Sequence, residues 1–406
     1  MKYEEIEGSV TAALGFKAAG VHCGIRKNRT KKDLGLIASD VLCNAAAIYT
    51  TNKVKGAPLI VTKEHLKNGK AQAIICNSGN ANTCNADGVF IATEMCKATG
   101  KALGIDPTDV VVASTGVIGQ PLPLEPITNA IPGLSEKLSK EGFDDVVEAI
   151  MTTDTRKKET AVKFNLGSKE CVIGGIAKGS GMINPNMATM LCFITTDANI
   201  SSEMLHEALL ETAAETFNMV SVDGDTSTND MVVILASGLS KNDEIKTKGA
   251  DYETFKEGLK IVMTYLSREI ARDGEGATKL IEAVVNGAPD IITARTVAKS
   301  VISSSLFKAA MFGADANWGR VLCAIGYSGA DVDVNKIDVE FESTGGRILV
   351  CKNGAGVEFS EELARQILVQ DEIKVIISLN DGNSSATAWG CDLTYDYVKI
   401  NGDYRT

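Results

Sequence analysis

Short apolar runs bounded by turn-forming residues predict strands along most of the chain. The run at 73–76 leads into the segment NSGNANTCNADG, and the run at 110–113 ends in the small-residue loop STGVIG. Runs of about four to eight apolar residues with such boundaries are typical of strands. On these grounds we predict strands at 59–62, 73–76, 110–113, 171–176, 190–194, 280–285, 338–342, 347–351, 372–379 and 393–401.

A second spacing, with apolar side chains three and four residues apart, predicts helices between these strands. The clearest case is 201–217, where Ser201 is a start signal and an apolar stripe follows. Helices are likewise predicted at 90–99, 144–151, 251–271, 294–307 and 360–368. Because strands and helices mix without strict alternation or an internal repeat, the pattern favours an α/β protein with a layered α+β sandwich over a barrel.

Composition and charge narrow the classes of function. The chain has 406 residues and a formal net charge of −11, which argues against nucleic acid as a partner. Its one basic stretch, residues 26–32, is interpreted as a solvated loop. No apolar run approaches the ~18 residues that span a bilayer, and the acidic N-terminal segment does not resemble a secretory signal. We therefore expect a cytoplasmic protein that binds no membrane.

The cysteines and histidines predict no metal site. Ten cysteines without an export signal are expected to be free thiols in a reducing cytosol. None forms a CxxC pair, and His22, His65 and His206 lie near no cysteine cluster. Zinc is therefore not expected.

One turn-forming segment, KGSGMINPNMATML at 178–191, runs directly into a predicted buried strand with Thr189 at the junction. A threonine in such a place is most often structural, with its hydroxyl completing the end of a loop. A catalytic threonine needs a base, because the hydroxyl alone is a weak nucleophile. No histidine stands in a polar cluster near a serine or threonine, which argues against a Ser-His-Asp triad.

Cleavage of the peptide bond between Ala188 and Thr189 would supply a different base. The freed α-amino group of Thr189 has an ordinary pKa of about 7.7–8.0, so it can accept the hydroxyl proton near neutral pH. The same hydroxyl could first attack the carbonyl of Ala188, a step that small residues around the junction permit. Self-cleavage and catalysis would then use one set of atoms.

The segment at 178–191 resembles the cleavage-site signature of the ornithine acetyltransferase family, in which a threonine follows an alanine at the scissile bond. Further blocks resemble that family in the family's own order, from Gly15 to Thr406. They are GFKAAGVHCGI, NSGNANTC, VASTGVIG, TTDT, FNMVSVDGDTSTND, RDGEGATK, GADANWGR and YVKINGDYRT. Each block is weak alone, but together they are very specific.

The resemblance implies a role for individual residues. Thr189 is the implied nucleophile, and Thr115 and Gly116 match the family's oxyanion hole, where a hydroxyl and an unhindered N–H can point at one developing oxyanion. Substrate-binding positions are implied at Thr152, Lys178, Thr189, Glu275, Asn401 and Thr406. Lys178 offers a cation to a carboxylate and Glu275 an anion to an ammonium group, which suits amino-acid substrates. The segment DGDTSTND is expected to form a polar, hydrogen-bonded turn near this site.

The resemblance also implies the architecture and the reaction. The fold would be Ntn-like, cut into an α chain of residues 1–188 and a β chain of residues 189–406, with a C-terminal α/β subdomain from about residue 285. The two chains would assemble as an α2β2 heterotetramer. The implied reaction is ping-pong transfer of acetyl from N2-acetylornithine to glutamate in arginine biosynthesis. No metal or organic cofactor is implied, and acetyl-CoA is a possible co-substrate because some family members also use it.

Two other functions are compatible with the same residues. A self-processing aminopeptidase or amidase of related fold would resolve the acyl-enzyme with water instead of glutamate. A non-catalytic amino-acid-binding protein would stay as one uncut chain and turn nothing over.

Overall fold

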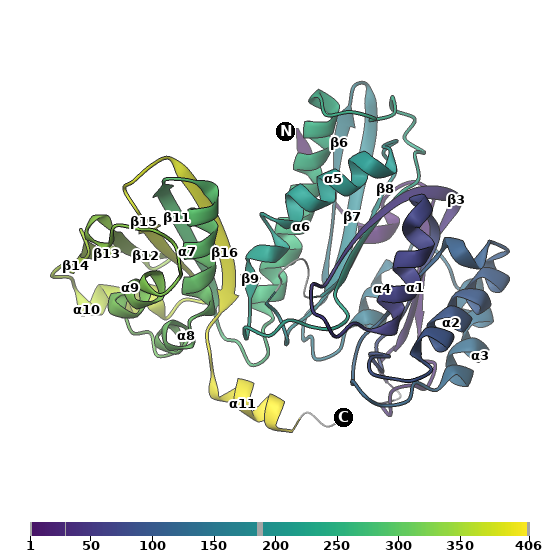
Figure 1. Cartoon of the computed structure of the whole chain (residues 1–406), viewed down its shortest axis with the longest axis horizontal. Coiled ribbons are helices and arrows are strands. Elements are labelled where there is room, and N and C mark those ends of the chain that lie inside the picture. The colour runs from purple at the N-terminus through teal and green to yellow at the C-terminus, as the bar shows by residue number, and fades with distance from the viewer. Residues whose placement is uncertain (1, 29, 185–189, 404–406) are drawn as a thin grey trace.

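The computed structural model describes residues 2–28, 30–184 and 190–403, and the strands in these ranges form two sheets that lie beside each other along the longest axis of the molecule (Figure 1). The first sheet has the order β1-β6-β7-β8-β10-β3-β4-β5, with β2 paired to β3. Its strands are β1 (Tyr3–Ile6), β2 (Phe16–Val21), β3 (Leu34–Tyr49), β4 (Lys70–Asn77), β5 (Val110–Ser114), β6 (Lys158–Leu166), β7 (Lys169–Lys178), β8 (Leu191–Thr196) and β10 (Met231–Ala236).

The second sheet has the order β14-β13-β12-β15-β11-β16-β9 and comes mainly from the last third of the chain. Its strands are β9 (Val220–Ser221), β11 (Leu280–Ala288), β12 (Asp338–Ser343), β13 (Gly346–Lys352), β14 (Ala355–Gly356), β15 (Glu372–Ser378) and β16 (Ser384–Cys391). Strand β9 lies in sequence between β8 and β10 of the first sheet and pairs in parallel with β16. One edge of the second sheet is therefore formed by a short strand whose neighbours in sequence belong to the first sheet.

Helices cover the sheets, which confirms the layered α/β class. They are α1 (Ala57–His65), α2 (Gly88–Leu103), α3 (Leu124–Glu136), α4 (Phe143–Ile150), α5 (Ser202–Ala213), α6 (Ala250–Arg272), α7 (Ile291–Ser303), α8 (Ser305–Phe312), α9 (Trp318–Gly326), α10 (Glu361–Leu368) and α11 (Tyr395–Gly402). Helix α6 contacts β6 and β7 of the first sheet as well as β11 and β16 of the second. It lies between the two sheets in Figure 1. None of the described helices is both long enough and apolar enough to cross a bilayer.

The centre of the first sheet is formed by the strands on either side of the predicted cleavage site. Every residue of β8 and β10 is buried, as the continuous apolar run at 190–194 predicts. Strand β8 pairs with β7 in antiparallel register, with Lys178 opposite Leu191, and in parallel with β10. The chain therefore leaves the sheet at Lys178 and re-enters it at the neighbouring position.

Helix α1 corrects a prediction, because the run at 59–62 is helical and not a strand. A run of four residues is too short to distinguish the helical period from the strand period. The deciding signal is Pro58 in the first helical turn, where its missing N–H costs nothing. The Thr62 hydroxyl exchanges hydrogen bonds of 2.7 and 2.9 Å with the backbone of Val112 in β5. Leu59, Val61 and Thr62 are therefore buried as one face of a helix that packs on the sheet, while Ile60 is exposed.

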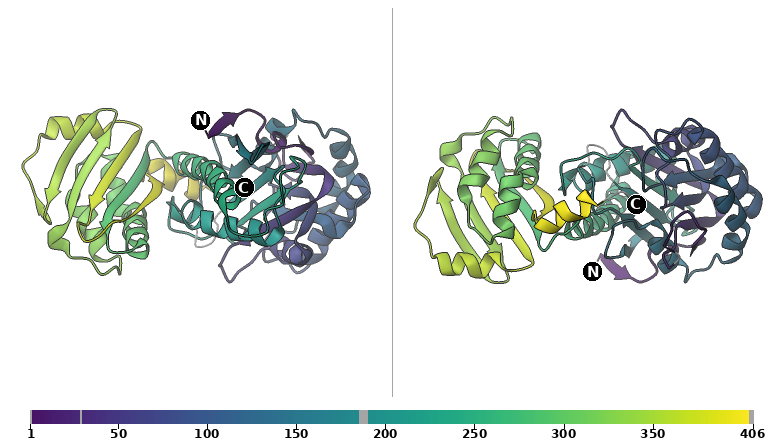
Figure 2. Two further views of the ribbon diagram at one scale, coloured as in Figure 1. Left: turned by 90° about the horizontal axis from the view of Figure 1, so that it is seen from above. Right: turned by 90° about the horizontal axis from the view of Figure 1, so that it is seen from below.

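Two further predictions near the C-terminus are wrong in detail. The helix predicted at 294–307 is two helices, α7 and α8, because Ser304 adopts an extended conformation and caps α8 through its hydroxyl. The strand predicted at 393–401 is helix α11, which follows one extended residue, Thr394. Its aromatic and β-branched residues resemble a strand, but the helix buries none of its side chains. In Figure 2 it runs from the second sheet back toward the middle of the molecule.

Close backbone contact at Gly174 in β7 generates the first prediction. A Cβ atom on Gly174 would lie 1.8 Å from the carbonyl oxygen of Ser9, so backbone would have to move. We expect Gly174→Ala to lower the free energy of unfolding by about 3 kcal/mol. Gly133→Ala is the matched control, since Gly133 lies in α3 with open space around its Cβ position and should gain about 0.5–1 kcal/mol. Thermal unfolding midpoints test both, and equal midpoints for the two variants would contradict this packing.

Candidate active site

A cavity of about 280 Å³ brings together all of the predicted site residues that the structure describes. They come from segments far apart in the sequence, at the ends of β5 and β7, after α4 and α6, and in α11. The six are Thr115, Gly116, Thr152, Lys178, Glu275 and Asn401. Ala188, Thr189 and Thr406 lie outside the described residues, so their roles stay predictions.

Thr115 and Gly116 follow β5 directly and form one wall of this cavity. The N–H of Thr115 donates to Asn77 O at 2.9 Å, which fixes the turn against the end of β4. Gly116 has φ +126°, and a Cβ there would lie 2.8 Å from the backbone nitrogen of Asn80, so only glycine fits. Within the described chain no group accepts from the Gly116 N–H, which leaves this donor available at the cavity wall.

Asn229 joins this turn to the segment that precedes β10. Its side-chain amide donates to Ala81 O at 2.5 Å and to Ser114 O at 2.9 Å. Its carbonyl oxygen accepts from the hydroxyls of Thr83 and Thr228. With its donors and acceptor all used, Asn229 holds the end of β5 in place beside the start of β10.

Lys178 is the last residue of β7 and is only 8% exposed. Its ammonium group lies 3.5 Å from the Thr115 hydroxyl, so a cation stands next to the proposed oxyanion hole. Burial lowers the pKa of Lys178, while the charge of Asp154 opposes that shift. A buried lysine of this kind binds a carboxylate strongly, because little water screens the interaction.

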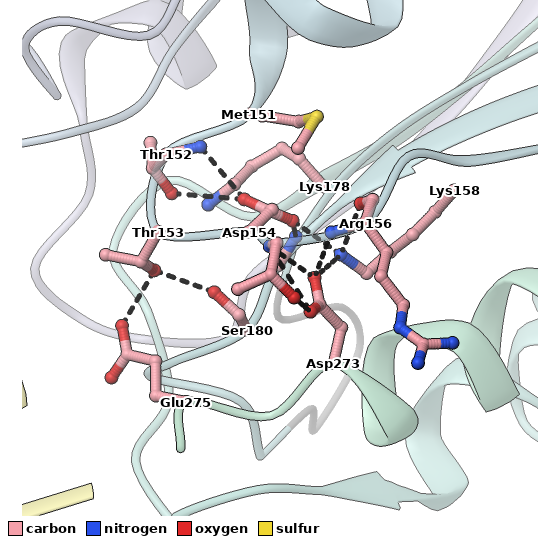
Figure 3. Close-up of polar contacts among 12 residues, drawn as sticks. Met151, Thr152, Thr153, Asp154, Arg156, Lys158, Lys178, Ser180, Asp273 and Glu275 are labelled. Atoms are coloured by element: carbon pink, nitrogen blue, oxygen red, sulfur yellow. Dashed lines mark hydrogen bonds and ion pairs between the residues drawn. The ribbon is translucent and has the colours of Figure 1, made fainter. Parts of the chain in front are cut away.

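The segment that holds Lys178 is anchored by Asp154, which is buried behind it (Figure 3). The Asp154 carboxylate accepts from the backbone N–H of Gly179 at 2.7 Å and from that of Thr152 at 2.9 Å. It also pairs with the fully buried ammonium of Lys158 at 2.7 Å. One carboxylate thus fixes two neighbouring walls of the cavity, the end of β7 and the turn at Thr152.

Asp273 completes this buried network from the end of α6. Lys158 donates to Asp273 at 2.6 Å as well as to Asp154, so the lysine bridges two acids. Asp273 also accepts from the backbone N–H of Thr155 and Arg156. Burial alone would raise the pKa of Asp154, but Lys158 and Lys178 together hold that pKa well below its usual range.

Glu275 lies two residues beyond Asp273 and faces the cavity with 9% of its surface exposed. One carboxylate oxygen accepts from the Thr153 hydroxyl at 2.7 Å, and the other accepts from the side-chain amide of Asn401 at 2.8 Å. The Thr153 hydroxyl is also 2.7 Å from that of Ser180 (Figure 3). Helix α11 thereby reaches the cavity through Asn401, which contacts Glu275 directly.

The turn DGDTSTND lies near the site, as predicted. The Asp223 carboxylate accepts from the backbone N–H of Met182 and Ile183, at 2.6 and 2.9 Å. Asn184 donates to Gly224 O, and Thr226 donates back to Asn184 O. The turn therefore holds the last described residues before the predicted cleavage site.

Comparison with known proteins identifies the family. The family model described as "ArgJ family" matches residues 17–406. The arginine biosynthesis bifunctional protein ArgJ of Caldanaerobacter subterraneus subsp. tengcongensis is 50% identical over 404 residues, which cover 99% of this chain and 100% of that protein. The chain belongs to the ArgJ family. It is therefore an N-acetyltransferase of arginine biosynthesis, and the predicted family resemblance is confirmed.

Two solved structures of ArgJ-type proteins are also similar to parts of the chain. The Bacillus halodurans arginine biosynthesis bifunctional protein argJ is 48% identical, with a TM-score of 0.49, and covers 52% of this chain and 97% of that one. The ornithine acetyltransferase of Mycobacterium tuberculosis, solved in complex with ornithine, is 33% identical, with a TM-score of 0.43, and covers 46% of this chain and 100% of that one.

Asp230 is a residue of this ArgJ-family site that the sequence analysis missed. It is 2% exposed and lines a cavity of about 20 Å³ together with Thr115, Lys178 and Met190. Met231, the next residue, donates its N–H to Met190 O at 2.9 Å. One carboxylate oxygen of Asp230 has no hydrogen-bond partner among the described residues. Burial raises the pKa of Asp230 well above its usual range, although Ser227 and Lys178 oppose the shift.

Asp154, Lys158 and Asp273 were also missed as functional residues. The i, i+4 spacing of Asp154 and Lys158 was the available signal, but such pairs are most often found on solvated surfaces. Only the three-dimensional fold places Asp273, more than a hundred residues away, against the same lysine. In the described residues no group of three histidine, cysteine or acidic side chains is arranged to hold a metal ion. The ten cysteines are unpaired, as predicted.

Removing the charge of Asp154 and removing that of Asp230 are expected to change the free energy of unfolding in opposite directions. The pKa of Asp154 is lower in the folded protein than its unfolded-state value of about 4. The Asp154 carboxylate therefore stabilises the fold above pH ~4, and this stabilisation is lost only as pH falls through the folded-state pKa. We expect Asp154→Asn to lower the free energy of unfolding at pH 7 by about 3 kcal/mol, because Lys158 loses a buried partner.

Asp230→Asn is the matched variant for that prediction. The pKa of Asp230 is higher in the folded protein than in the unfolded chain. The contribution of Asp230 to stability is therefore fully present below pH ~4 and is lost as pH rises toward the folded-state pKa. Asp230→Asn should therefore become more stable relative to the wild type as pH rises. Unfolding midpoints measured from pH 5 to 8 test the pair. A Tm for Asp154→Asn equal to that of the wild type would contradict the network.

Proposed function

We propose that this chain transfers acetyl from N2-acetylornithine to glutamate by a ping-pong mechanism, with Thr189 as the nucleophile. The observation that carries the proposal is the convergence of six implied residues on one cavity next to Met190, the residue that follows Thr189. Family membership supports the same reaction.

The first half-reaction is an acyl transfer to the Thr189 hydroxyl. The hydroxyl attacks the acetyl carbonyl, and the freed α-amino group of Thr189 takes its proton. Thr115 Oγ1 and the Gly116 N–H stabilise the negative oxygen of the tetrahedral intermediate, with the Lys178 ammonium 3.5 Å from Thr115 Oγ1. Collapse of the intermediate returns that proton to the departing amine, so ornithine leaves and acetyl-Thr189 remains.

The charges of the cavity suit an α-amino acid. Lys178 and Glu275 are the two charged residues among its described lining, and they come from the end of β7 and from the segment after α6. The Lys178 ammonium would bind a carboxylate, and Glu275 would bind an ammonium group. A site with one buried cation and one buried anion favours a zwitterion over a neutral or singly charged molecule. In the second half-reaction the amine of glutamate attacks acetyl-Thr189 and carries the acetyl group away.

Self-cleavage between Ala188 and Thr189 would divide the chain without dividing the fold. The α chain, residues 1–188, would keep β1 to β7, and the β chain, residues 189–406, would keep β8 to β16. The pairs β7–β8 and β3–β10 each join one chain to the other in the centre of the first sheet. The two products would therefore remain bound until the protein is denatured.

The proposal also covers the assembly, the location and the acetyl donors of the enzyme. We propose an α2β2 heterotetramer of the cleaved chains, acting in the cytoplasm on small-molecule substrates. The mechanism above needs no metal or organic cofactor, and acetyl-CoA is proposed as an additional acetyl donor. The competing aminopeptidase or amidase function has no separate support in the cavity, whose paired charges suit an amino-acid acceptor as well as an amino-acid donor.

The variant Thr189→Ala tests self-cleavage and catalysis together. It lacks the hydroxyl that attacks Ala188, so we expect one uncut band on a denaturing gel and no acetyl transfer, whereas the wild type gives two bands. Thr189→Ser is the matched control, because it retains hydroxyl and amine and should still be cut, more slowly. Two bands from Thr189→Ala would place the cut elsewhere or assign it to another protease.

The nature of the acceptor is tested by following ornithine release from N2-acetylornithine with and without glutamate. A transferase should release one ornithine per active site without glutamate and then stop, because acetyl-Thr189 accumulates. Added glutamate should restore continuous release. Continuous release at the same rate in both conditions would show that water is the acceptor and would support the hydrolase instead.

A further inference from the structure

A cavity of about 20 Å³ adjoins the candidate active site and has room for one water molecule. Thr115 and Lys178 line both this cavity and the 280 Å³ one, whereas Asp230 lines only the smaller. A buried water needs at least about 10–15 Å³ and roughly two to four polar partners. The Thr115 hydroxyl, the Lys178 ammonium and the Asp230 carboxylate supply such partners. The small cavity therefore meets both conditions for a buried water.

The Asp230 carboxylate has hydrogen-bonding capacity that the described residues do not use. Its side chain is buried, and one carboxylate oxygen has no hydrogen-bond partner within the described ranges. The Ser227 hydroxyl is a hydrogen-bond partner of the same carboxyl group. A buried polar atom without a partner is costly, because it has lost its contacts with bulk water and gained none in exchange. This oxygen points to a small hydrogen-bond donor in the cavity.

Hydrogen bonds hold the backbone on both sides of Asp230. Thr50, the residue after β3, donates its N–H to Asp230 O at 3.0 Å and its hydroxyl to Ser227 O at 2.9 Å. Met231, the first residue of β10, donates its N–H to Met190 O at 2.9 Å. The carboxylate is therefore presented to the cavity by a fixed backbone.

Lys178 reaches the same cavity from the other side of β8. Lys178 in β7 and Met231 in β10 are both register partners of Leu191 in β8. Within the described chain, the Lys178 ammonium has one hydrogen bond, to Thr115 Oγ1 at 3.5 Å. An ammonium group has three donor hydrogens, so this single long contact leaves two of them for other partners. A group placed between Lys178 and the β10 strand would complete its hydrogen bonding.

We propose that one ordered water molecule in the 20 Å³ cavity joins the Asp230 carboxylate to the Lys178 ammonium, and that Asp230 is thereby a positioning residue for Lys178. The inference rests on the proposed function, in which Lys178 binds the substrate carboxylate beside the Thr115–Gly116 turn. The water accepts from Lys178 and donates to Asp230. The ammonium is then held against Thr115 Oγ1, so the hydrogen of the Thr115 hydroxyl stays directed at the developing oxyanion.

Asp230 also affects the charge of Lys178. The titratable groups around this lysine come from several segments: Cys76, Asp154, Lys158, Asp230 and Glu275. Burial lowers the pKa of Lys178, whereas the charges of Asp154 and Asp230 raise it. Asp154 is already paired with Lys158 at 2.7 Å, but Asp230 forms no ion pair with any described residue. A water that hydrates both Asp230 and Lys178 favours the charged form of each.

The pH dependence of kcat/KM for N2-acetylornithine tests the inference in the variant Asp230→Asn of the full-length, processed enzyme. The amide keeps the shape of the side chain without its charge, so Lys178 should lose its proton at lower pH. We expect the alkaline limb to move down by about one pH unit, which makes kcat/KM about tenfold lower above both limbs, mainly through KM. On the plateau below the limbs the two enzymes should be nearly equal. A loss by the same factor at every pH, or an unmoved alkaline limb, would overturn the inference.

Two further measurements need neither turnover nor processing. The pKa of Lys178 is read from the 13C resonance of ε-labelled lysine, with Lys178 assigned by the signal that is lost in Lys178→Arg. We expect this pKa to fall by about one unit in Asp230→Asn. A high-resolution crystal structure of the wild type should show a water within hydrogen-bond distance of both Asp230 and Lys178. An unchanged Lys178 pKa, or a protein atom in place of that water, would contradict the proposal.

A matched variant and the wild type separate this inference from the proposed function. Asp243→Asn removes the same charge from an exposed acid outside the site, so it should keep the pH profile and the Lys178 pKa of the wild type. A shift in Asp243→Asn equal to that in Asp230→Asn would show a general effect of net charge and overturn the inference. Failure of the wild type to transfer acetyl from N2-acetylornithine would instead refute the proposed function, while the Lys178 pKa and the bound water would still decide the link to Asp230.

Discussion

The interaction on which the site depends is the contact of the Asp154 carboxylate with the backbone N–H of Gly179. A buried carboxylate is costly unless its charge and its lone pairs are satisfied. Asp154 meets that condition with two backbone N–H groups and Lys158, and Lys158 in turn bridges to Asp273. The end of β7, the turn at Thr152 and the end of α6 are thereby held together. Lys178 and Glu275 stand in fixed positions because each lies within two residues of this network.

The two halves of the fold meet at the same place for a topological reason. Strands β7 and β8 are antiparallel neighbours in the first sheet, so the segment between them leaves and re-enters the sheet at neighbouring positions. The residue after β5 lies close to this place, since Thr115 Oγ1 is 3.5 Å from the Lys178 ammonium. Helix α6 connects this sheet to the second one, and α11 returns from the second sheet to place Asn401 on Glu275. The proposed cut in the connecting segment would therefore not release either chain, since the strand pairs β7–β8 and β3–β10 join the two products.

Much of the fold could be predicted from the sequence, because long periodic segments such as α6 and continuous apolar strands such as β8 have strong local signals. The failures lie where local signals compete. Residues 60–62 are β-branched yet helical, and α11 has a strand-like composition but buries none of its side chains. The cavity residues were found through family blocks. The sequence around Asp154, Lys158 and Asp273 does not identify them as one group. The two acids contact the same lysine only after folding brings the start of β6 next to the end of α6.

The proposed mechanism requires residue 189 to become the acetylated nucleophile at the start of a separate chain. The most direct measurement is the intact mass of the denatured wild-type protein after incubation with N2-acetylornithine alone. We expect two chains, 1–188 and 189–406, with one acetyl group on the second chain that disappears when glutamate is added. A single chain of 42.9 kDa, or an acetyl group located on the first chain, would contradict it.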